Sequence, residues 1–520
     1  MDGRVRMVAT QTLGDGSDVR IECELEYVNK RRGISRHSDK CFCCGQCRKR
    51  WQLAVLATIG FAILFGVRCN FAAAKNRMVG QWFDQSGFLH NGTCFWTRHE
   101  VGIMERSFFY GYVITQLPGG LLAVKISPNK LFGMAIGVAS VLNILMPLAC
   151  TGGPALVVLV QGLQGLVQGV SYPAMHGVWR FWAPHMERSK LATTVLAGSC
   201  VGTVLGLKLS AWLVANVGWT APFWFYGVAG IVWTVFWYSL TFEKPALHPT
   251  ISEEEKLYIE AQLGQVSNVQ PSLAAIPWKD IVTSMPVWAI SVASFAHSWT
   301  FYLLLMHQLA YMRDIFKIYI SQIGWLLLLP HFVSAIVILI GGQLADYLRS
   351  TNILTTTTTR KIFTCGGFGA EALFLLVVAC NTSQTVSLIG LTLAISCSGL
   401  PISGFYVNHL DLAPRFASVL MGISNSLSTL SGLICPVITE KLRSNGLAGW
   451  QAIFLLASLI HLTGVIFYGI FASGDQQDWA EAPPDEQEPT RRPGDFAQNA
   501  YANVLVSLDM KLSQVLSKQQ

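Results

Sequence analysis

The chain is dominated by apolar runs of about twenty residues, the length that a helix needs to cross a hydrocarbon core about 30 Å thick. The runs contain glycine and proline but few charges, as transmembrane helices do. Only 13% of all residues are charged, against about 25% in a typical soluble protein. This pattern predicts an all-α membrane protein with twelve transmembrane helices.

The predicted spans fall into two groups of six. They cover about residues 51–74, 107–126, 131–150, 153–175, 190–215, 221–241, 286–306, 322–345, 362–380, 385–408, 414–437 and 450–472. The first half therefore occupies 51–241, a polar linker occupies 242–285, and the second half occupies 286–472. Residues 1–50 form a polar tail. The tail 473–520 is rich in Asp, Glu and Pro at its start, and we expect it to be disordered.

Basic residues indicate which side of the membrane the tails occupy. They precede span one and lie between spans two and three, four and five, and eight and nine: Arg48, Lys49, Arg50, Lys125, Lys130, Arg180, Arg188, Lys190, Arg349, Arg360 and Lys361. The positive-inside rule makes this side, and both tails, cytosolic. Topology thus accounts for the formal charge of +7 without a nucleic-acid partner. Asn91, in the lumenal or extracellular loop 75–106, begins a glycosylation sequon.

Short sequences recur six spans apart. GGLLAVK (119–125) follows span two and GGQLADYLR (341–349) follows span eight, while WAPHMERSKLA (182–192) and LAPRFASVLMG (412–422) precede spans five and eleven. An internal repeat of this kind indicates two related six-helix halves. The whole plan resembles that of the major facilitator superfamily.

Four ionisable residues lie inside predicted spans, where a charge is costly unless it faces a cavity or a partner. They are Arg68 in span one, Lys208 in span five, His297 in span seven and Glu371 in span nine. Spans one and seven occupy corresponding, path-lining places in this fold type, so Arg68 and His297 form a candidate anion site. His297 alone could equally bond a neighbouring helix. Lys208 could extend toward the membrane surface, and Glu371 suits a structural role on a bracing helix.

Charged residues after span eight suggest a gate. Asp346, Arg349 and Arg360 suit a charge cluster that locks helices together at the cytosolic side. Val124 stands at the matching position of the first half, so only one copy of the lock is complete. Enzyme motifs are missing from the sequence, and the cysteines of CFCCGQC (41–47) lack zinc-site spacing. We therefore expect a non-enzyme without metal or cofactor.

Longer stretches resemble the vesicular glutamate transporters and their relatives, sialin and the type I sodium–phosphate cotransporters. They are GVRCNFAAA (66–74), SFFYGYVITQLPGG (107–120), YPAMHGVWRFWAPHMERSKLATT (172–194), SWTFYLLL (298–305), GGQLADYLRS (341–350), TTTTTRKI (355–362), NHLDLAPRFAS (408–418) and FASGDQQDWA (471–480). The vesicular glutamate branch is the most similar. The resemblance implies a secondary active carrier of organic anions, with glutamate as the leading substrate.

The resemblance also gives roles to five positions. Arg68 matches an arginine that holds the substrate carboxylate, and His297 matches a second such arginine. Gln161 and Gln168 match an arginine and a glutamate tied to anion and proton coupling. Glu105 matches a histidine that senses lumenal acidity, although a loop-end carboxylate paired with Arg106 is the simpler reading. Four of these five positions differ from the family pattern, which leaves the substrate open.

Two further residues complete the candidate set, namely Tyr406 in span ten for substrate and His176 after span four for proton or anion coupling. The usual pKa of histidine is about 6.5, so its ring is mostly charged at acidic pH and mostly neutral at the pH of the cytosol. His297 would therefore favour loading from an acidic lumen and release into the cytosol, the direction in which sialin works.

Several alternatives remain open at this stage. Arg68 would also hold phosphate, which admits sodium-dependent phosphate transport, and a proton-coupled carrier of acidic sugars or amino acids is another reading. The lost charges also admit a carrier-like protein that acts in membrane trafficking without transport. Expected partners are a small organic anion, chloride, sodium or protons, and the lipid bilayer around a monomer. We expect synaptic, endosomal or secretory vesicles, with the plasma membrane as an alternative.

Overall fold

The computed structural model describes residues 4–12, 18–26, 48–79, 82–83, 89–90, 92–94, 96–263, 273–317 and 320–481. The sequon asparagine Asn91 and the cysteines of residues 41–47 lie outside these ranges, so the predictions for them stay predictions. Residues 1–47 and 48–520 form two separate units.

The first unit contains an antiparallel hairpin of β1 (Arg4–Thr12) and β2 (Asp18–Glu26). Its register runs from the pair Arg4 and Glu26 to the pair Thr12 and Asp18. The sequence analysis predicted only a polar tail here and missed the hairpin. The signal was present, because apolar and polar residues alternate with a period of two along most of β2, DVRIECELE.

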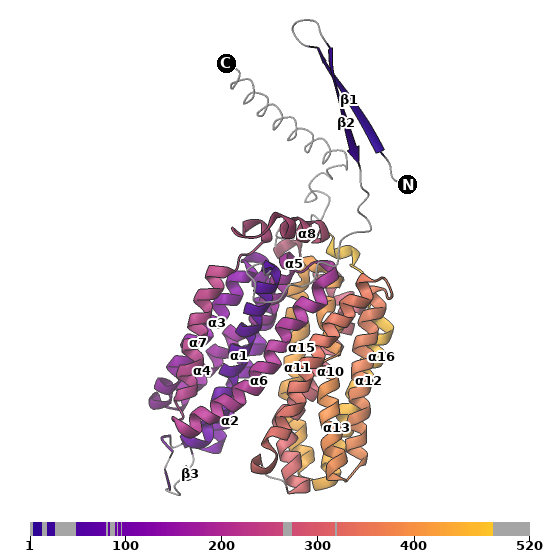
Figure 1. The fold of residues 1–520 in the computed structure, drawn as a ribbon. Coiled ribbons are helices and arrows are strands. Elements are labelled where there is room, and N and C mark those ends of the chain that lie inside the picture. Colours follow the sequence, from indigo (N-terminus) through magenta and orange to yellow (C-terminus); the bar gives the residue numbers. More distant parts are fainter. Residues whose placement is uncertain are drawn as a thin grey trace. The chain divides into compact units, whose positions relative to one another are not determined.

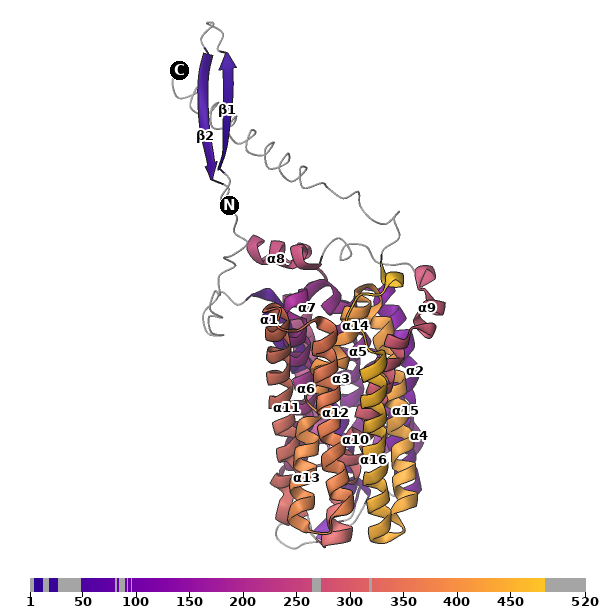
Figure 2. The same ribbon diagram turned by 90° about the vertical axis from the view of Figure 1, so that its right-hand side faces the viewer.

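The second unit is a helical bundle, shown in Figures 1 and 2. Its first half comprises α1 (Lys49–Val79), α2 (Arg98–Lys125), α3 (Pro128–Gly152), α4 (Pro154–Gln168), α5 (Ser171–Trp182), η2 (His185–Glu187), α6 (Arg188–Asn216) and α7 (Ala221–Leu240). Its second half comprises α10 (Met285–Phe316), α11 (Ile320–Ser350), α12 (Thr356–Cys380), α13 (Gln384–Cys397), η6 (Pro401–Ser403), α14 (Phe405–Leu412), η7 (Pro414–Phe416), α15 (Ala417–Arg443) and α16 (Gly446–Phe471).

Short elements connect the long helices. Between the halves lie η3 (Pro245–Leu247), α8 (Glu253–Leu263), η5 (Leu273–Ala275) and α9 (Trp278–Thr283), while β3 (Trp82–Phe83) pairs with β4 (Leu89–His90) between α1 and α2, and η8 (Asp478–Ala480) follows α16. Eleven of the described helical segments are long and apolar enough to cross a membrane. Helix α2 is the twelfth long segment of the bundle, so an all-helical fold with eleven to twelve spans is confirmed.

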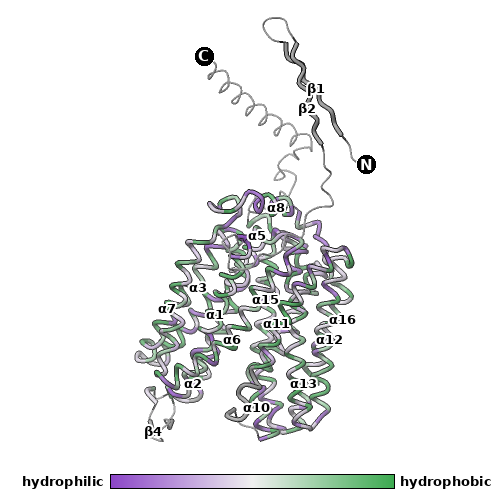
Figure 3. The backbone as a smooth tube through the Cα atoms, in the orientation of Figure 1, coloured by the Kyte–Doolittle hydropathy of each residue, from purple (hydrophilic) through white to green (hydrophobic). Residues whose placement is uncertain are grey.

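The two halves repeat one packing scheme. In the first half α1 packs against α6, α2 against α4, and α3 against α7; in the second half α10 packs against α15, α12 against α16, and α11 against α13. The main contacts between the halves are those of α6 with α11 and of α2 with α15, and α5 also packs against α15. Figure 3 shows hydrophobic residues along these helices and hydrophilic residues around α8. We call this end of the bundle the α8 end.

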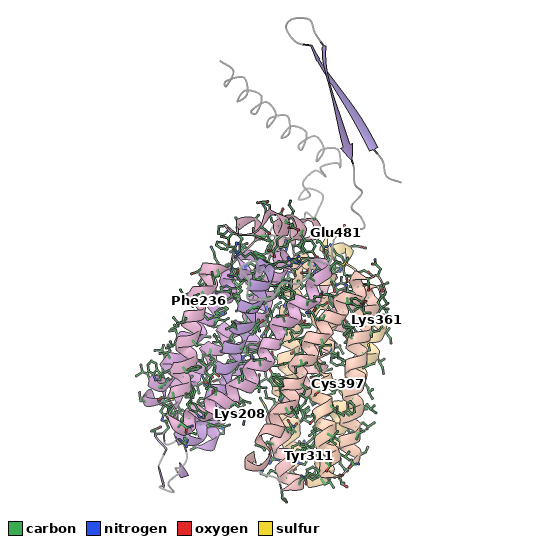
Figure 4. All side chains as sticks on the ribbon, viewed as in Figure 1. Lys208, Phe236, Tyr311, Lys361, Cys397 and Glu481 are labelled. Carbon is green, nitrogen blue, oxygen red and sulfur yellow. The ribbon has the colours of Figure 1, made fainter. Side chains whose placement is uncertain are left out.

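The outer surface of the bundle is apolar. On α7, the exposed side chains include Trp224, Phe225, Val235 and Phe236, and Figure 4 shows Phe236 at the outer edge. Monomeric soluble proteins rarely expose apolar patches of this kind. A lipid environment accounts for them, because lipid tails replace water as the neighbour of these side chains.

Helix α2 begins about nine residues before the predicted span at 107. Thr97 caps its N-terminus: the Thr97 hydroxyl accepts from the backbone N–H of Glu100 at 3.2 Å, and the Glu100 carboxylate accepts from the backbone N–H of Thr97 at 2.7 Å. This capping box satisfies two amide groups that the helix leaves unpaired. The residues of α2 before position 107 are mostly polar, and the cap at Thr97 marks their start instead of a hydrophobic run. A hydropathy profile therefore does not assign them to the helix.

Two predicted spans are broken at corresponding places of the halves. The span predicted over 153–175 is α4 and α5, separated by Gly169 and Val170, and the span predicted over 385–408 is α13, η6 and α14. Side chains satisfy carbonyl groups that the breaks release: the Thr115 hydroxyl donates to the carbonyl of Leu166 at 2.7 Å. Paired discontinuous helices commonly mark the binding site of a transporter with internal repeats.

Glycines bring the halves into backbone contact near the α8 end. A Cβ atom on Gly120 of α2 would lie 2.5 Å from the carbonyl oxygen of Ser418, at the start of α15, and one on Gly422 would lie 2.7 Å from that of Gln116. Side chains at either position would therefore separate the halves. This end of the bundle is closed by close helix contact.

Helix α8 is anchored to the first half. The carboxylate of Glu255 accepts from the backbone N–H groups of Lys49 and Arg50, at 2.8 and 3.2 Å, and from the Arg50 guanidinium at 2.9 Å. Glu255 therefore caps the N-terminus of α1, where a negative charge is favourable. The guanidinium of Arg50 also pairs with Glu187 at 2.7 Å.

The segment after α16 is ordered where it was expected to be disordered. The side-chain amide of Asn408 donates to the carbonyl of Ser473 at 2.9 Å, and the ring of Trp479 lies 6.4 Å from that of Phe416. The prediction of disorder is therefore wrong for residues 473–481, and residues 482–520 lie outside the described ranges. The sequence contained one indication of this order, namely an apolar residue, Trp479, within a polar segment.

Candidate functional site

Arg68 of α1 lies half-buried in a pocket of aromatic rings. Its Nε donates to the amide oxygen of Gln168 at 2.8 Å. The guanidinium carbon lies 4.5 Å from the ring centroid of Phe65, 5.4 Å from Phe108 and 4.7 Å from Tyr112, which is cation–π geometry. Within the described residues, no acidic side chain forms an ion pair with Arg68. Its positive charge is therefore held in place and left available for an anion.

Four candidate residues come from the four helices expected to surround the central path. Arg68 lies on α1, Gln168 ends α4, His297 lies on α10 and Tyr406 lies on α14. The ring of Tyr406 lies 6.1 Å from that of Tyr172 on α5, so aromatic groups of both halves meet. Gln168 and Tyr406 adjoin the two helix breaks.

His176 of α5 bridges the two halves. Its Nδ1 lies 3.2 Å from the carbonyl oxygen of Tyr172, in its own helix, and its Nε2 lies 3.3 Å from that of Tyr406, in the other half. A carbonyl oxygen only accepts, and a neutral imidazole has only one N–H. Only the doubly protonated ring donates to both oxygens, so this contact responds to protonation.

His297 of α10 is packed between two phenylalanines. Its ring lies 6.4 Å from that of Phe368 and 5.7 Å from that of Phe405. Its Nδ1 is buried without a hydrogen-bond partner. The contacts of His297 and those of Arg68 have no residue in common, so the structure does not bring these two candidate cations together in this conformation.

Gln161 and Glu105 lie away from Arg68. Gln161 is buried on α4 two turns before Gln168, on the same helix face. Glu105 of α2 pairs with Lys75 of α1, with 2.5 Å between Oε1 and Nζ. The expected pairing with Arg106 is wrong, because Arg106 Nε donates to its own helix, at the carbonyl of Gly102.

The pair of Lys75 and Glu105 should contribute little stability, because the two side chains are 33% and 36% exposed. Water screens such pairs, which are typically worth about 0.2–1 kcal/mol. We expect a double-mutant cycle with Lys75→Met and Glu105→Gln, measured by thermal unfolding, to give a coupling free energy in that range. A coupling above about 2 kcal/mol would mean that the pair is desolvated and belongs to the closed core.

The predicted gate residues lie together at the α8 end. The carboxylate of Asp346 accepts from the backbone N–H groups of Ser189 and Lys190, at 3.2 and 2.7 Å, and lies 3.8 Å from Arg349. Asp346 thus joins the end of α11 to the N-terminus of α6, where the helix dipole favours an anion. This contact crosses from one half to the other.

Asp411 completes the cluster, and the sequence analysis missed it. Its carboxylate accepts from Arg360 Nε at 2.7 Å and from Arg188 Nη1 at 3.2 Å. Arg360 also donates to the hydroxyl of Ser189 at 2.8 Å. All three charged side chains are buried. The sequence contained one indication of this role: Asp411 is an acidic residue just after span ten, beside the Ala-Pro pair that occurs in both halves.

Two ionisable candidates remain, Lys208 and Glu371. Lys208 of α6, labelled in Figure 4, is half-buried. Glu371 of α12 is buried 3.2 Å from Nε2 of His461 on α16, between two bracing helices. In the described residues, no group of histidine, cysteine and acidic side chains has the arrangement of a metal site.

Comparisons with known proteins agree with this architecture. The family model described as Major Facilitator Superfamily matches residues 53–436. The chain is 58% identical over 445 residues to the probable vesicular glutamate transporter eat-4 of Caenorhabditis elegans, covering 85% of this chain and 77% of that protein. It is 47% identical over 454 residues to vesicular glutamate transporter 2 of Homo sapiens, covering 86% and 78%.

A solved structure shares the fold alone. The structure of the fucose:proton symporter FucP of E. coli superposes with a TM-score of 0.59 at 12% identity, covering 81% of this chain and 99% of that one. At this identity the match supports the arrangement of the helices and carries no information on substrate.

Proposed function

Because the chain belongs to the Major Facilitator Superfamily and, within it, to the vesicular glutamate transporters, we propose that it is a secondary active carrier that moves glutamate across the membrane of an intracellular vesicle. The observation that carries this proposal is the state of Arg68. Its guanidinium lies among three aromatic rings and is bonded to a neutral amide. Its positive charge is therefore available to bind a substrate carboxylate.

The chemistry of Arg68 fits a carboxylate. A guanidinium forms two parallel hydrogen bonds with a carboxylate, and such charge-assisted bonds are roughly twice as strong as neutral ones. Its Nε donates to Gln168, which leaves the terminal nitrogens of the guanidinium for a carboxylate. The neutral amide of Gln168 positions the guanidinium and leaves its charge for the substrate.

We assign the α8 end to the cytosol, with both tails on that side. Two basic residues of the predicted cytosolic side support this assignment: Arg50 pairs with Glu255 of α8, and Lys361 lies toward this end in Figure 4. The cluster of Asp346, Arg349, Arg360, Arg188 and Asp411 then closes the cytosolic side. In the structure it joins α6 to α11 and α14, so this conformation would present Arg68 to the lumen. Protons, membrane potential and chloride are the proposed drivers, acting on a monomer.

The substitution at position 297 gives a direct test. Histidine is mostly neutral at pH 7.5 unless its surroundings favour the charged form, so His297→Arg would add a permanent cation beside the path. We expect this variant to lower the KM for glutamate at neutral pH by about tenfold or more, since about 1.4 kcal/mol is a tenfold change in affinity. The measurement is glutamate uptake into proteoliposomes with chloride and an inside-positive potential, at internal pH 5.5 and 7.5.

The unmodified chain supplies the reference in the same assay, with sodium replaced by choline in a parallel series. Sodium-independent uptake by the unmodified chain would support the proposal. If neither chain takes up glutamate under any of these conditions, the proposed substrate is wrong. If the KM of His297→Arg equals that of the unmodified chain at both pH values, position 297 does not contact the substrate.

A further inference from the structure

The C-terminal half contains a buried acid–histidine contact away from the proposed substrate site. Glu371 of α12 and His461 of α16 are 1% and 0% exposed, and Oε2 of the first lies 3.2 Å from Nε2 of the second. Neither atom has a hydrogen-bond partner elsewhere. Two titratable groups thus face each other in the dry interior, where an uncompensated charge is expensive.

The fold does not require ionisable groups at this position. In the first half, the corresponding helices α3 and α7 are joined by neutral groups: the amide of Asn143 donates to the carbonyl of Phe223 at 2.8 Å. A structural brace could be built in the same way from α12 and α16. The ionisable pair therefore calls for an explanation besides packing.

The surroundings of His461 indicate how many protons the pair holds. Nδ1 lies 3.1 Å from the carbonyl oxygen of Ala457 and 3.3 Å from the hydroxyl oxygen of Thr300. Because the carbonyl only accepts, and the Thr300 hydroxyl can accept as well, this arrangement favours a hydrogen on Nδ1. Nε2 of a neutral ring would then present a lone pair to the carboxylate. One proton between Nε2 and Oε2 removes this repulsion, either as imidazolium with carboxylate or as imidazole with carboxylic acid.

We propose that Glu371 and His461 form a proton-binding dyad, which at neutral pH holds one proton between Nε2 and Oε2 in addition to a hydrogen on Nδ1, and exchanges that proton with solution during the transport cycle. The dyad touches the path helix α10: Thr300 lies one turn after His297, and the ring of Phe368 contacts both His297 and His461, at 6.4 and 5.1 Å. Among the described residues, the other titratable groups that interact with Glu371 are His297 on α10 and Cys397 on α13.

A spectroscopic measurement on the purified, full-length chain tests proton occupancy without any substrate. The chain has 11 histidines, so His461→Gln identifies the ¹⁵N signals of His461 by their loss, and Glu371→Gln identifies the infrared carboxyl band. At pH 7 we expect His461 as imidazolium or Glu371 as carboxylic acid. In Glu371→Gln, His461 should become a neutral imidazole protonated on Nδ1. A neutral His461 protonated on Nε2, facing an ionised Glu371 in the unmodified chain, would overturn the proposal.

Transport then tests exchange, and this arm rests on the proposed function. The double variant Glu371→Gln with His461→Gln keeps a neutral hydrogen-bonding pair of similar size. We expect it to fold, to retain its KM, and to lose at least half of the dependence of uptake on internal pH. An unchanged pH profile in the folded variant would make the pair a brace and overturn exchange. The spectra remain interpretable if glutamate is not the substrate.

The chain offers a matched control pair. His307 of α10 and Glu440 of α15 lie 3.9 Å apart, but the Glu440 side chain is 60% exposed. Water solvates this carboxylate, so it needs no shared proton. The variant His307→Gln with Glu440→Gln should leave the pH profile of uptake unchanged. An equal change in both double variants would mean that the effect is not specific to the buried dyad.

Discussion

Glutamate uptake should fall at least about 30-fold in Arg68→Ala. The variant removes a guanidinium that lies 4.5 and 4.7 Å from the rings of Phe65 and Tyr112 and that forms no ion pair with any acidic side chain the structure describes. Truncating one partner of a buried charge pair typically costs about 2–5 kcal/mol, which is about 30-fold or more in affinity. Initial rates of uptake into proteoliposomes at several glutamate concentrations provide the measurement.

Two further variants separate charge from folding in this experiment. Arg68→Lys keeps the charge but loses the planar fork, so partial uptake with a raised KM is expected. Arg313→Ala removes an arginine that is 53% exposed and is paired with its neighbour Asp314, and it should behave as the unmodified chain does. Full uptake by a folded Arg68→Ala protein would show that the substrate is held elsewhere.

The second large effect concerns stability. We expect Asp411→Asn to destabilise the protein by about 3–5 kcal/mol, because it removes the carboxylate shared by two buried arginines. Arg360 and Arg188 bind the two oxygens at 2.7 and 3.2 Å, and their side chains are 0% and 2% exposed. Asparagine offers one acceptor without charge. Yield and thermal unfolding of the detergent-purified protein measure the loss.

The partly exposed carboxylate of Asp314 is the matched control for Asp411. It pairs with Arg443 at 2.6 Å, but the two side chains are 27% and 24% exposed, so Asp314→Asn should cost no more than about 1 kcal/mol. Combining Asp411→Asn with Arg360→Gln should recover part of the stability, since one uncompensated cation is removed. Equal effects of the two single substitutions would mean that burial does not determine the strength of these pairs.

Much of the fold could be predicted from the sequence because a membrane enforces simple rules. Span length follows bilayer thickness, and the repeated sequences around residues 119–125 and 341–349 reveal the halves. The two helix breaks were missed because hydropathy does not respond to backbone direction. QGVSYP at 168–173 and SGLPISG at 398–404 contained the signal, namely glycine and proline at matching places in both halves.

The candidate site was less predictable because pairing partners come from distant segments. Arg68 was identified as a lone charge in a span, but its neutral partner Gln168 lies 100 residues away. Glu371 was expected to brace its helix, yet nothing in its own span indicates His461. Such contacts depend on which helix faces pack together, and an apolar helix surrounded by other apolar helices gives little indication of its orientation.

Helix α8 and the segment 473–481 are held by different halves. Glu255 fixes α8 to α1, whereas Ser473 and Trp479 bind the segment to α14 and η7. Each segment must accompany its own half when the bundle rocks. The distance between fluorophores on the exposed residues Leu257 and Asp478 should therefore change as the halves move. This distance would report the conformational cycle from the surface without altering any helix that lines the path.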